Sequence, residues 1–471
     1  MVFNTLEFAI FLPVVFAVHW LLPYRGRLVF LLAASYLFYG WWDPRFLSLL
    51  AFSTLIDYFV ARAMDTTPIE RRRKQFLLVS IVVQLGILGF FKYSGFFVES
   101  AAALLNSIGL EANLPLLNII LPVGISFYTF QTMSYTIDVY RRRIPACRSL
   151  LTFALFVAYF PQLVAGPIER AGRLLPQMEA HREFPSGERI ASGLVLIGLG
   201  LFKKVAIADV MAPIVDASFA DPSSQSSLAL MVGVYAFALQ IYGDFSGYTD
   251  IGRGASRLLN IELMRNFEQP YLSRNITEFW RTWHVSLSSW LHDYLYVPLG
   301  GNRKGPRRTY LNLMIVMVLG GLWHGAAWTF VIWGALHGLF LIVHRLTGHY
   351  SPRGYQGRFS LRHDGLRALI TFNLVCLAWV FFRAPSVASA WDYLTGILAL
   401  RPGVPPVSWV LLLVPAAVLV FLIDLAQRNS DEHDVILTWK PAYQGLVYAT
   451  FFLGILIFSG GPMIPFIYFQ F

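Results

Sequence analysis

The chain has few cysteines and few charged residues for its length. Two of its 471 residues are cysteines, so neither a disulfide framework nor a thiolate metal site is expected. Charged residues make up 14% of the chain and hydrophobic residues 56%, which excludes an ordinary soluble protein. The alternating strand pattern of an outer-membrane barrel is also missing.

Long apolar runs recur along the whole sequence instead. A helix needs about 20 mostly apolar residues to cross about 30 Å of hydrocarbon, and runs approaching that length begin near residue 7. The sequence therefore predicts an all-α, polytopic membrane protein. A net charge of +10 would suggest nucleic acid in a soluble protein, but in a polytopic one it indicates basic cytoplasmic loops, so no nucleic-acid partner is expected.

Basic clusters set the predicted orientation in the membrane. The runs 71–74 and 141–143 place their loops on the cytoplasmic side, and the uncharged start, 1–6, on the periplasmic side. The first span is expected to be retained, because no basic region precedes it and Glu7 lies at its start. The segment 149–166 is interrupted by prolines and glycine, which indicates a re-entrant segment.

We expect a single integral membrane domain in three parts. Its N-terminal spans lie in 1–147, a motif-bearing core in 148–345 and its C-terminal spans in 346–471. No internal repeat and no separable soluble domain is evident. The ends of two expected core spans carry charged residues.

The first of these spans, near 189–202, ends in Lys203 and Lys204, for which snorkelling to an interface is the simplest interpretation. The second, near 227–243, runs into a glycine-punctuated turn that carries Asp244 and Asp250.

His324 is an unusual residue for a membrane protein. It stands in an apolar helical run, GLWHG, with Gly320, Gly321 and Ala327 as helical neighbours that leave room for a ligand or a partner helix. An ionisable group at membrane depth is costly and is by default a functional candidate. The alternative is a hydrogen bond to a neighbouring backbone. Because the spans expected near 310–322 and 326–344 flank it closely, His324 is predicted to lie near a break.

A second group of polar residues lies in the segment 280–296. Read as one helix, this segment places Arg281, His284, Ser288 and His292 on one face and Leu287 with three aromatic residues on the other. This pattern indicates an amphipathic helix whose polar stripe lines a chamber, or else an interfacial helix with a solvated face. His337 and His344, near the basic end of a later span, are expected to be interface residues.

These residue types suit general acid–base chemistry. A neutral imidazole with a pKa of about 6.5 can take a proton from an alcohol as it attacks an acyl carbonyl. No Gly-x-Ser-x-Gly motif indicates a serine nucleophile. Zinc ligation by His284, His292 and His324 is conceivable, but no His-Glu-x-x-His run supports it, and no metal is expected. From the residues alone, acyl transfer and transport both remain open.

Several long sequence segments resemble those of the membrane-bound O-acyltransferase (MBOAT) family. They are WRTWHVSLS at 280–288, WLHDYLYVPLGGNR at 290–303 and LWHG at 322–325. The similarity is to the bacterial branch of the family that contains the membrane subunit of alginate O-acetyltransferase, and it covers nearly the whole chain. Further matching words lie at 1–3, 35–42, 121–131, 244–250 and 465–471.

The resemblance implies a ring of about 11 transmembrane helices around a central tunnel, with re-entrant or interfacial helices. It implies that His324 and His284 are catalytic. Relatives often carry arginine at the position of His292, so no catalytic role is assigned to it and a wall residue is expected. We predict contacts with substrate for Arg281, Ser288, Trp323 and Asp244.

The function implied is that of an O-acyltransferase of the bacterial inner membrane. It would move acetyl groups across the membrane for O-acetylation of an exported polysaccharide such as alginate or cellulose. No bound cofactor is expected, and the acyl donor would be acetyl-CoA or another acyl thioester. Expected partners are the lipid bilayer, a periplasmic acetyltransferase protein and the machinery of polysaccharide synthesis and export.

The alternative function is a polytopic transporter of a lipid or polysaccharide precursor without covalent chemistry. Transporters often show inverted repeats and paired broken helices. The sequence shows no such repeat.

Overall fold

A computed structural model describes residues 1–110, 119–348, 358–430, 432–461 and 464–467. These residues form helices joined by turns and loops, and the described ranges contain no strand. Residues 468–471 of the matching segment at 465–471 lie outside these ranges. Two compact units are distinguished, residues 1–189 with 255–263, and residues 190–254 with 264–471.

Eight helices of the described chain are long and apolar enough to cross a membrane. This confirms the predicted all-helical, polytopic class, while the total number of spans stays a prediction. The candidates are Phe46–Thr66, Glu70–Ser107, Gly187–Ala220, Ser227–Leu258, Trp328–Leu346, Leu361–Arg383, Val407–Ser430 and Pro441–Phe458.

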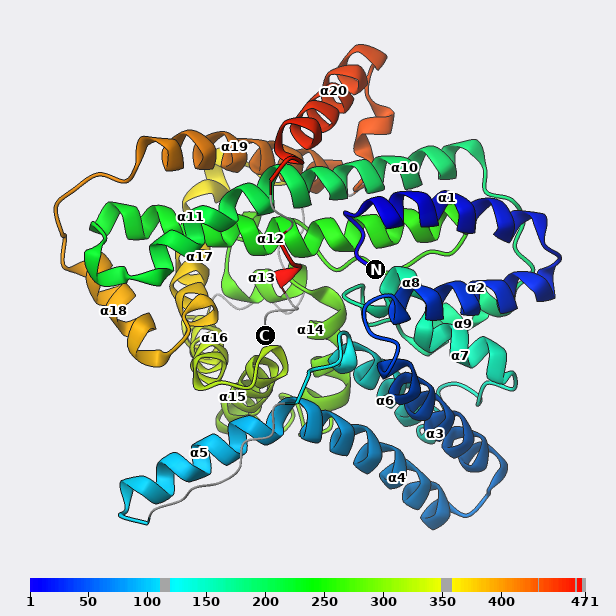
Figure 1. The fold of residues 1–471 in the computed structure, drawn as a ribbon. Helices are drawn as coiled ribbons and strands as arrows, with labels where there is room; N and C mark the ends of the chain where they lie inside the picture. Colours follow the sequence, from blue (N-terminus) through cyan, green and yellow to red (C-terminus); the bar gives the residue numbers. More distant parts are fainter. Residues whose placement is uncertain (111–118, 349–357, 431, 462–463, 468–471) are drawn as a thin grey trace. The chain divides into compact units, whose positions relative to one another are not determined.

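The first unit contains nine α-helices and one π-helical turn within its described residues. In chain order these are α1 (Leu6–Leu21), α2 (Tyr24–Gly40), α3 (Phe46–Thr66), α4 (Glu70–Leu88), η1 (Gly89–Tyr93), α5 (Ser94–Ser107), α6 (Ile125–Tyr140), α7 (Leu150–Ala158), α8 (Phe160–Leu163) and α9 (Ala171–Glu179). Helices α3, α4 and α6 pack against one another (Figure 1). Polar groups join the first two: Gln84 donates to Asp57 Oδ2 (2.9 Å) and Ser80 donates to Asp57 Oδ1 (2.6 Å). Buried polar groups must be paired in this way, because an unpaired one is costly in an apolar interior.

The interruption predicted within 149–166 is present. Helix α7 ends at Ala158, and Tyr159 leaves the helical conformation before the short helix α8. The Tyr159 hydroxyl is 2.9 Å from the hydroxyl of Ser256. Gly166 lies so close to Gln162 that an added Cβ would stand 2.3 Å from the Gln162 Cα. The break is therefore confirmed, and entry and exit of this segment on one side of the membrane stay a prediction.

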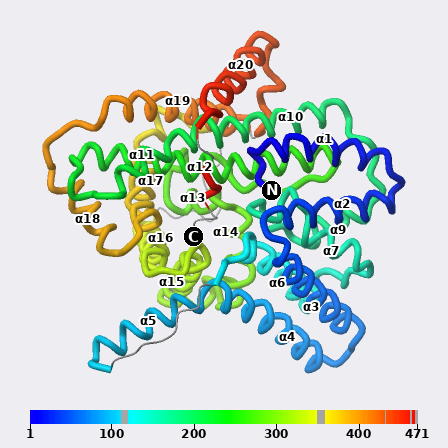
Figure 2. Tube along the Cα trace, viewed as in Figure 1, coloured from blue at the N-terminus to red at the C-terminus, as the bar shows by residue number. Residues whose placement is uncertain are grey.

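The second unit begins with a helix much longer than expected. Helix α10 (Gly187–Phe202) does not end before Lys203, but continues through a π-helical stretch, η2 (Lys203–Ala208), into α11 (Asp209–Ala220) (Figure 2). Lys203 and Lys204 are 3% and 5% exposed, so snorkelling was the wrong interpretation. Both lysines lie beside buried carboxylates, which stabilise the positive charge of the lysines inside the protein. Lys203 Nζ is 2.8 Å from Asp250 Oδ2.

The turn expected after residue 243 is also absent. Helix α12 (Ser227–Leu258) runs without interruption through Asp244 and Asp250. Its glycines allow close contact with α10 instead. A Cβ added to Gly247 would lie 2.7 Å from the backbone oxygen of Gly200, and one added to Gly254 would lie 2.4 Å from that of Gly193. Small residues at a helix crossing let backbones approach closely, and this role is hard to distinguish from turn formation in a single sequence.

The remaining helices of the second unit carry the motifs. They are α13 (Ile276–Thr282), α14 (Val285–Leu291), the π-helical η5 (His292–Tyr296), α15 (Gly305–His324), α16 (Trp328–Leu346), α17 (Leu361–Arg383), α18 (Val387–Leu398), α19 (Val407–Ser430) and α20 (Pro441–Phe458). Short 3-10 turns lie at Pro222–Ser224, Pro270–Leu272 and Val435–Thr438. Helices α15 and α16 lie side by side, and α16 also packs on α17 (Figure 1).

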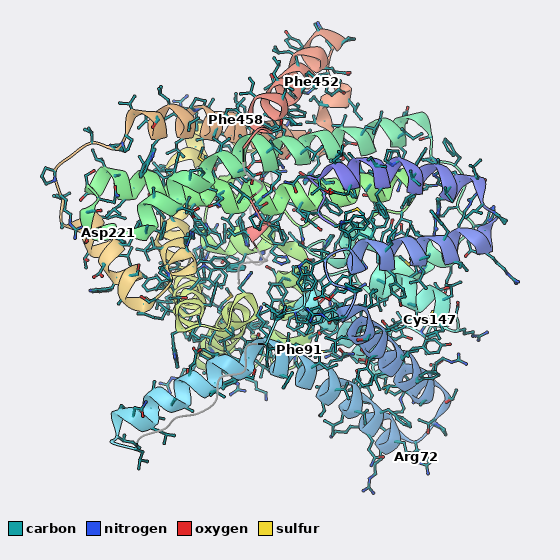
Figure 3. All side chains as sticks on the ribbon, viewed as in Figure 1. Arg72, Phe91, Cys147, Asp221, Phe452 and Phe458 are labelled. Carbon is teal, nitrogen blue, oxygen red and sulfur yellow. The ribbon has the colours of Figure 1, made fainter. Side chains whose placement is uncertain are left out.

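Helix α20 presents a broad apolar surface. Figure 3 shows Phe452 and Phe458 standing at its surface, and they are 66% and 39% exposed. Exposed aromatic side chains on a long apolar helix are typical of contact with lipid.

Candidate functional site

His324 stands at the end of a helix, as predicted. It is the last residue of α15, and Gly325–Ala327 separate it from the start of α16. Glycines on both sides of it make room for the chain to reverse direction. A Cβ added to Gly321 would lie 2.1 Å from the backbone oxygen of Phe330, and one added to Gly325 would lie 2.0 Å from the Phe330 ring. The GLWHG run therefore closes a tight helical hairpin and holds His324 in its bend.

Aromatic rings surround His324. The centres of the Trp323, Trp333 and Phe382 rings lie 5.1, 5.1 and 5.3 Å from the centre of its imidazole. The side chain is 3% exposed. Charge–dipole interactions are stronger in such a water-poor surrounding than in bulk water.

The segment 280–296 is not one helix, and this prediction was wrong. Helix α13 ends at Thr282, α14 begins at Val285, and His284 between them has a φ of 44° in the left-handed region. A residue with a side chain rarely adopts this conformation, which costs free energy and tends to occur at functional sites. The break removes His284 from the polar stripe, because residues before and after it no longer share one helical face with it.

The break places His284 inside the protein, close to His324. Its side chain is fully buried, and the two imidazole ring centres are 6.3 Å apart. The Phe245 ring packs edge-on against His284 at 4.7 Å, and the Trp323 ring lies at 5.7 Å. Burial lowers the pKa of His284 to about 3, so the imidazole is neutral at physiological pH.

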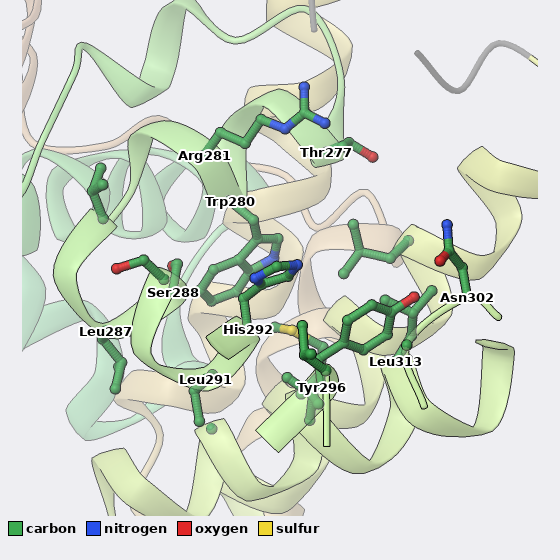
Figure 4. Close-up of a pocket in the computed structure, with 18 of the residues that line it drawn as sticks. Thr277, Trp280, Arg281, Leu287, Ser288, Leu291, His292, Tyr296, Asn302 and Leu313 are labelled. Atoms are coloured by element: carbon green, nitrogen blue, oxygen red, sulfur yellow. The ribbon is translucent and has the colours of Figure 1, made fainter. Parts of the chain in front are cut away.

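A pocket of about 710 Å³ opens next to His324. Figure 4 shows its polar lining, with Arg281 and Thr277 on one side and His292, Tyr296 and Asn302 on the other. Arg303 and Arg345 add two further cations to the lining. A cavity of this size suits a small-molecule ligand, and three arginines suit one that carries phosphate or carboxylate groups.

The predicted site residues divide into two groups. His324, Arg281 and Ser288 line the pocket, as does His292, whose ring is exposed and stacks on Tyr296. His284, Trp323 and Asp244 are not among the lining residues that the structure describes. The rings of His284 and Trp323 pack near the His324 ring, at 6.3 and 5.1 Å between ring centres.

Asp244 is held by other protein groups. Its carboxylate is 3.0 Å from Lys204 Nζ and accepts a hydrogen bond from the backbone N–H of Ile467 (2.7 Å). Contact between Asp244 and substrate stays a prediction.

His337 has a place that the sequence did not indicate. It is fully buried, so its assignment as an interface residue was wrong. Trp280 Nε1–H donates to His337 Nδ1 (3.2 Å), and the His337 ring lies parallel to Phe279 and next to Trp333. His337 thus orients Trp280 of the pocket wall. The spacing of four between Trp333 and His337 on α16 was a weak signal for the contact between these two rings only.

Among the described residues, no group of three or more histidines, cysteines and carboxylates is gathered where it could hold a metal ion.

Comparison with known proteins agrees with these features. Residues 140–391, which include both histidine motifs, match the family model of MBOAT, the membrane-bound O-acyltransferase family. A probable alginate O-acetylase, AlgI, of Azotobacter vinelandii is 44% identical over 396 residues, covering 83% of this chain and 77% of the relative. A peptidoglycan O-acetyltransferase of Helicobacter pylori is 37% identical over 432 residues, covering 85% and 80%.

A more distant relative is a teichoic acid D-alanyltransferase of Bacillus subtilis. It is 25% identical over 280 residues, which cover 56% of this chain and 69% of the relative. The family model and the two more similar relatives establish the family of the chain independently of this one. The protein is a member of the membrane-bound O-acyltransferase family.

Proposed function

We propose that this protein is an O-acetyltransferase of the bacterial inner membrane that passes acetyl groups outward for the O-acetylation of an exported polysaccharide. The observation that carries the proposal is a buried pair of histidines, His324 and His284, with His324 at the wall of a pocket of about 710 Å³. The names of two relatives, a probable alginate O-acetylase and a peptidoglycan O-acetyltransferase, support a polysaccharide acceptor, which we propose to be alginate-like or cellulose-like. A transporter without covalent chemistry is not favoured, because the family transfers acyl groups.

His324 would act as the general base. It takes the proton from the hydroxyl of the acceptor while the hydroxyl oxygen attacks the carbonyl carbon of the acetyl thioester. The tetrahedral intermediate collapses with cleavage of the carbon–sulfur bond. The thiolate leaves and receives the proton from the His324 imidazolium, so that ester, free thiol and neutral histidine result.

The donor would enter the pocket that Arg281, Arg303 and Arg345 line. Arginine binds phosphate through paired hydrogen bonds, and phosphates are a feature of acetyl-CoA and of carrier-bound thioesters alike. We propose an acetyl thioester as a substrate, with no resident cofactor. Ser288, which also lines the pocket, would contact the donor or the acceptor.

Purified protein in lipid nanodiscs should hydrolyse acetyl-CoA to acetate and CoA, with water in place of the acceptor hydroxyl. Arg281→Ala should raise the KM for acetyl-CoA by about 10-fold or more, since hydrogen bonds to charged groups contribute about 1.5 to 3 kcal/mol. Kinetics of thiol release measure both effects. An acetyl thioester of N-acetylcysteamine has no phosphate and serves as the control, because Arg281→Ala should leave its KM unchanged. If folded wild-type protein releases no thiol from either donor, the proposed function is wrong.

The proposed orientation has the donor on the cytoplasmic side. The basic runs 71–74 and 141–143 would face the cytoplasm, and the N-terminus the periplasm. A separate periplasmic protein, together with the polymer synthesis and export machinery, would then complete transfer to the polysaccharide.

Reporter fusions test this orientation. Alkaline phosphatase, which is active only in the periplasm, should be inactive when fused within 65–75 and active when fused near residue 43. A fluorescent protein that matures in the cytoplasm should give the opposite pattern. Reversed signals would contradict outward transfer.

A further inference from the structure

Asn266 holds the chain directly after His284. Its backbone oxygen accepts a hydrogen bond from Val285 N–H (2.9 Å), and its side-chain oxygen accepts one from Ser286 N–H (3.3 Å). The same side-chain oxygen is 2.6 Å from the hydroxyl oxygen of Ser286. Asn266 and Ser286 are 1% and 0% exposed. Three hydrogen bonds accepted by Asn266 therefore fix the start of α14, and with it the left-handed turn at His284.

The hydrogen bonds determine where the hydroxyl proton of Ser286 lies. A backbone N–H can only donate, so the Asn266 atom that faces Ser286 N is the amide oxygen. An amide oxygen can only accept, so the Ser286 hydroxyl donates its hydrogen to Asn266. The Ser286 oxygen is also 3.4 Å from His284 Nδ1. Its hydrogen is already committed, and it therefore presents a lone pair to the imidazole.

We propose that Asn266 and Ser286 are positioning residues that fix His284 as the Nδ1–H tautomer. Its Nε2 is then unprotonated and can accept a hydrogen bond or a proton. In a neutral imidazole the bond made by one nitrogen decides the protonation of the other. The effect of this tautomer on catalysis rests on the proposed function, because it requires that His284 takes part in acyl transfer.

The tautomer selects between two roles for His284. Polarising the carbonyl of the acyl donor would need an N–H that points at the carbonyl oxygen. With Nε2 unprotonated, His284 accepts instead, from an N–H of His324, whose ring centre is 6.3 Å away and which lines the pocket. His284 therefore assists proton removal and does not stabilise the oxyanion.

The tautomer can be measured without any substrate. In wild-type protein with ¹⁵N-labelled histidine in nanodiscs, the ¹⁵N chemical shifts distinguish protonated from unprotonated ring nitrogens. The chain has 10 histidines, and the His284 signals are those lost in His284→Gln. We expect a protonated Nδ1 and an unprotonated Nε2. A protonated Nε2 would overturn the proposal, whether or not the protein transfers acetyl groups.

Variants test the link to catalysis. Ser286→Ala removes the acceptor for Nδ1–H and should lower kcat by roughly 10- to 100-fold, as loss of the partners that orient metal-binding histidines does, with the KM for the donor unchanged. Ser286→Thr keeps the hydroxyl and should retain most of kcat. Ser218→Ala, at another fully buried serine on α11, is the matched control and should keep wild-type activity.

Asn266→Ala frees the Ser286 hydroxyl to donate to Nδ1, so the ¹⁵N spectrum should shift toward the Nε2–H form. Wild-type kcat in Ser286→Ala, or a His284 spectrum unchanged in Asn266→Ala, would overturn the proposal. Acetyl transfer that is absent from wild-type protein, with the expected tautomer in its spectrum, would refute the proposed function and leave the tautomer assignment standing.

Discussion

Replacement of His324 by glutamine should abolish acetyl transfer while the protein stays folded in the membrane. Glutamine keeps a polar side chain of similar size in the bend between α15 and α16, but it cannot take up a proton. A general base contributes a factor of about 10² to 10⁴ in rate, and the buried surrounding of His324 gives bulk water little access to replace it. Acetyl content of the polymer in cells and thiol release by purified protein measure the loss.

The matched control is His363→Gln. His363 lies exposed in the first turn of α17 and is not among the residues that line the pocket, so this variant should keep full activity. Membrane levels of both variants are compared by immunoblot. A stable His324→Gln protein with wild-type acetylation would show that His324 is not the base.

Local sequence signals were sufficient to place His324. Its neighbours Gly321 and Gly325 are within four residues of it, and the bend that they permit follows from their small size alone. Arg281 and Ser288 were also placed near the site, although the continuous helix from which they were inferred does not exist. Both line the pocket because each belongs to a short helix on one side of the break.

The break at His284 could not be predicted from local pattern. It depends on Asn266, which is 18 positions earlier and bonds to Val285 and Ser286. Helical periodicity within 280–296 takes no account of a partner at that distance. The pairing of Trp280 with His337, 57 positions apart, was missed for the same reason.

The charges on α10, η2 and α11 show the same limit. Two consecutive lysines after an apolar run are most simply explained by an interface, since a lone charge in the membrane is costly. The explanation changes when the partners are known. Lys204 Nζ lies 2.8 Å from Asp209 Oδ1 and 3.0 Å from Asp244 Oδ1, and it donates to the backbone oxygen of Ile464 (3.0 Å). One lysine thus contacts two carboxylates.

We therefore expect Lys204→Met to lower the free energy of unfolding by about 3 to 5 kcal/mol, the cost of breaking a buried ion pair on one side. Methionine fills a similar volume but leaves Asp244, which is 3% exposed, without the cation that it contacts. Unfolding can be followed with a maleimide dye that becomes fluorescent on reaction with Cys147 and Cys376, both buried in the folded protein. Lys440→Met, at an exposed position before α20, is the control and should change the free energy by no more than about 0.5 kcal/mol.

The double variant Lys204→Met/Asp244→Asn separates the ion pair from simple loss of packing. Removing the second charge as well should restore part of the stability, because the penalty of Lys204→Met comes mainly from the carboxylate that it leaves uncompensated. If the double variant melts at a lower temperature than Lys204→Met, Asp244 contributes through contacts other than Lys204. If Lys204→Met melts as the wild type does, the lysine is not needed to balance Asp209 and Asp244, and the interpretation of this buried charge group is wrong.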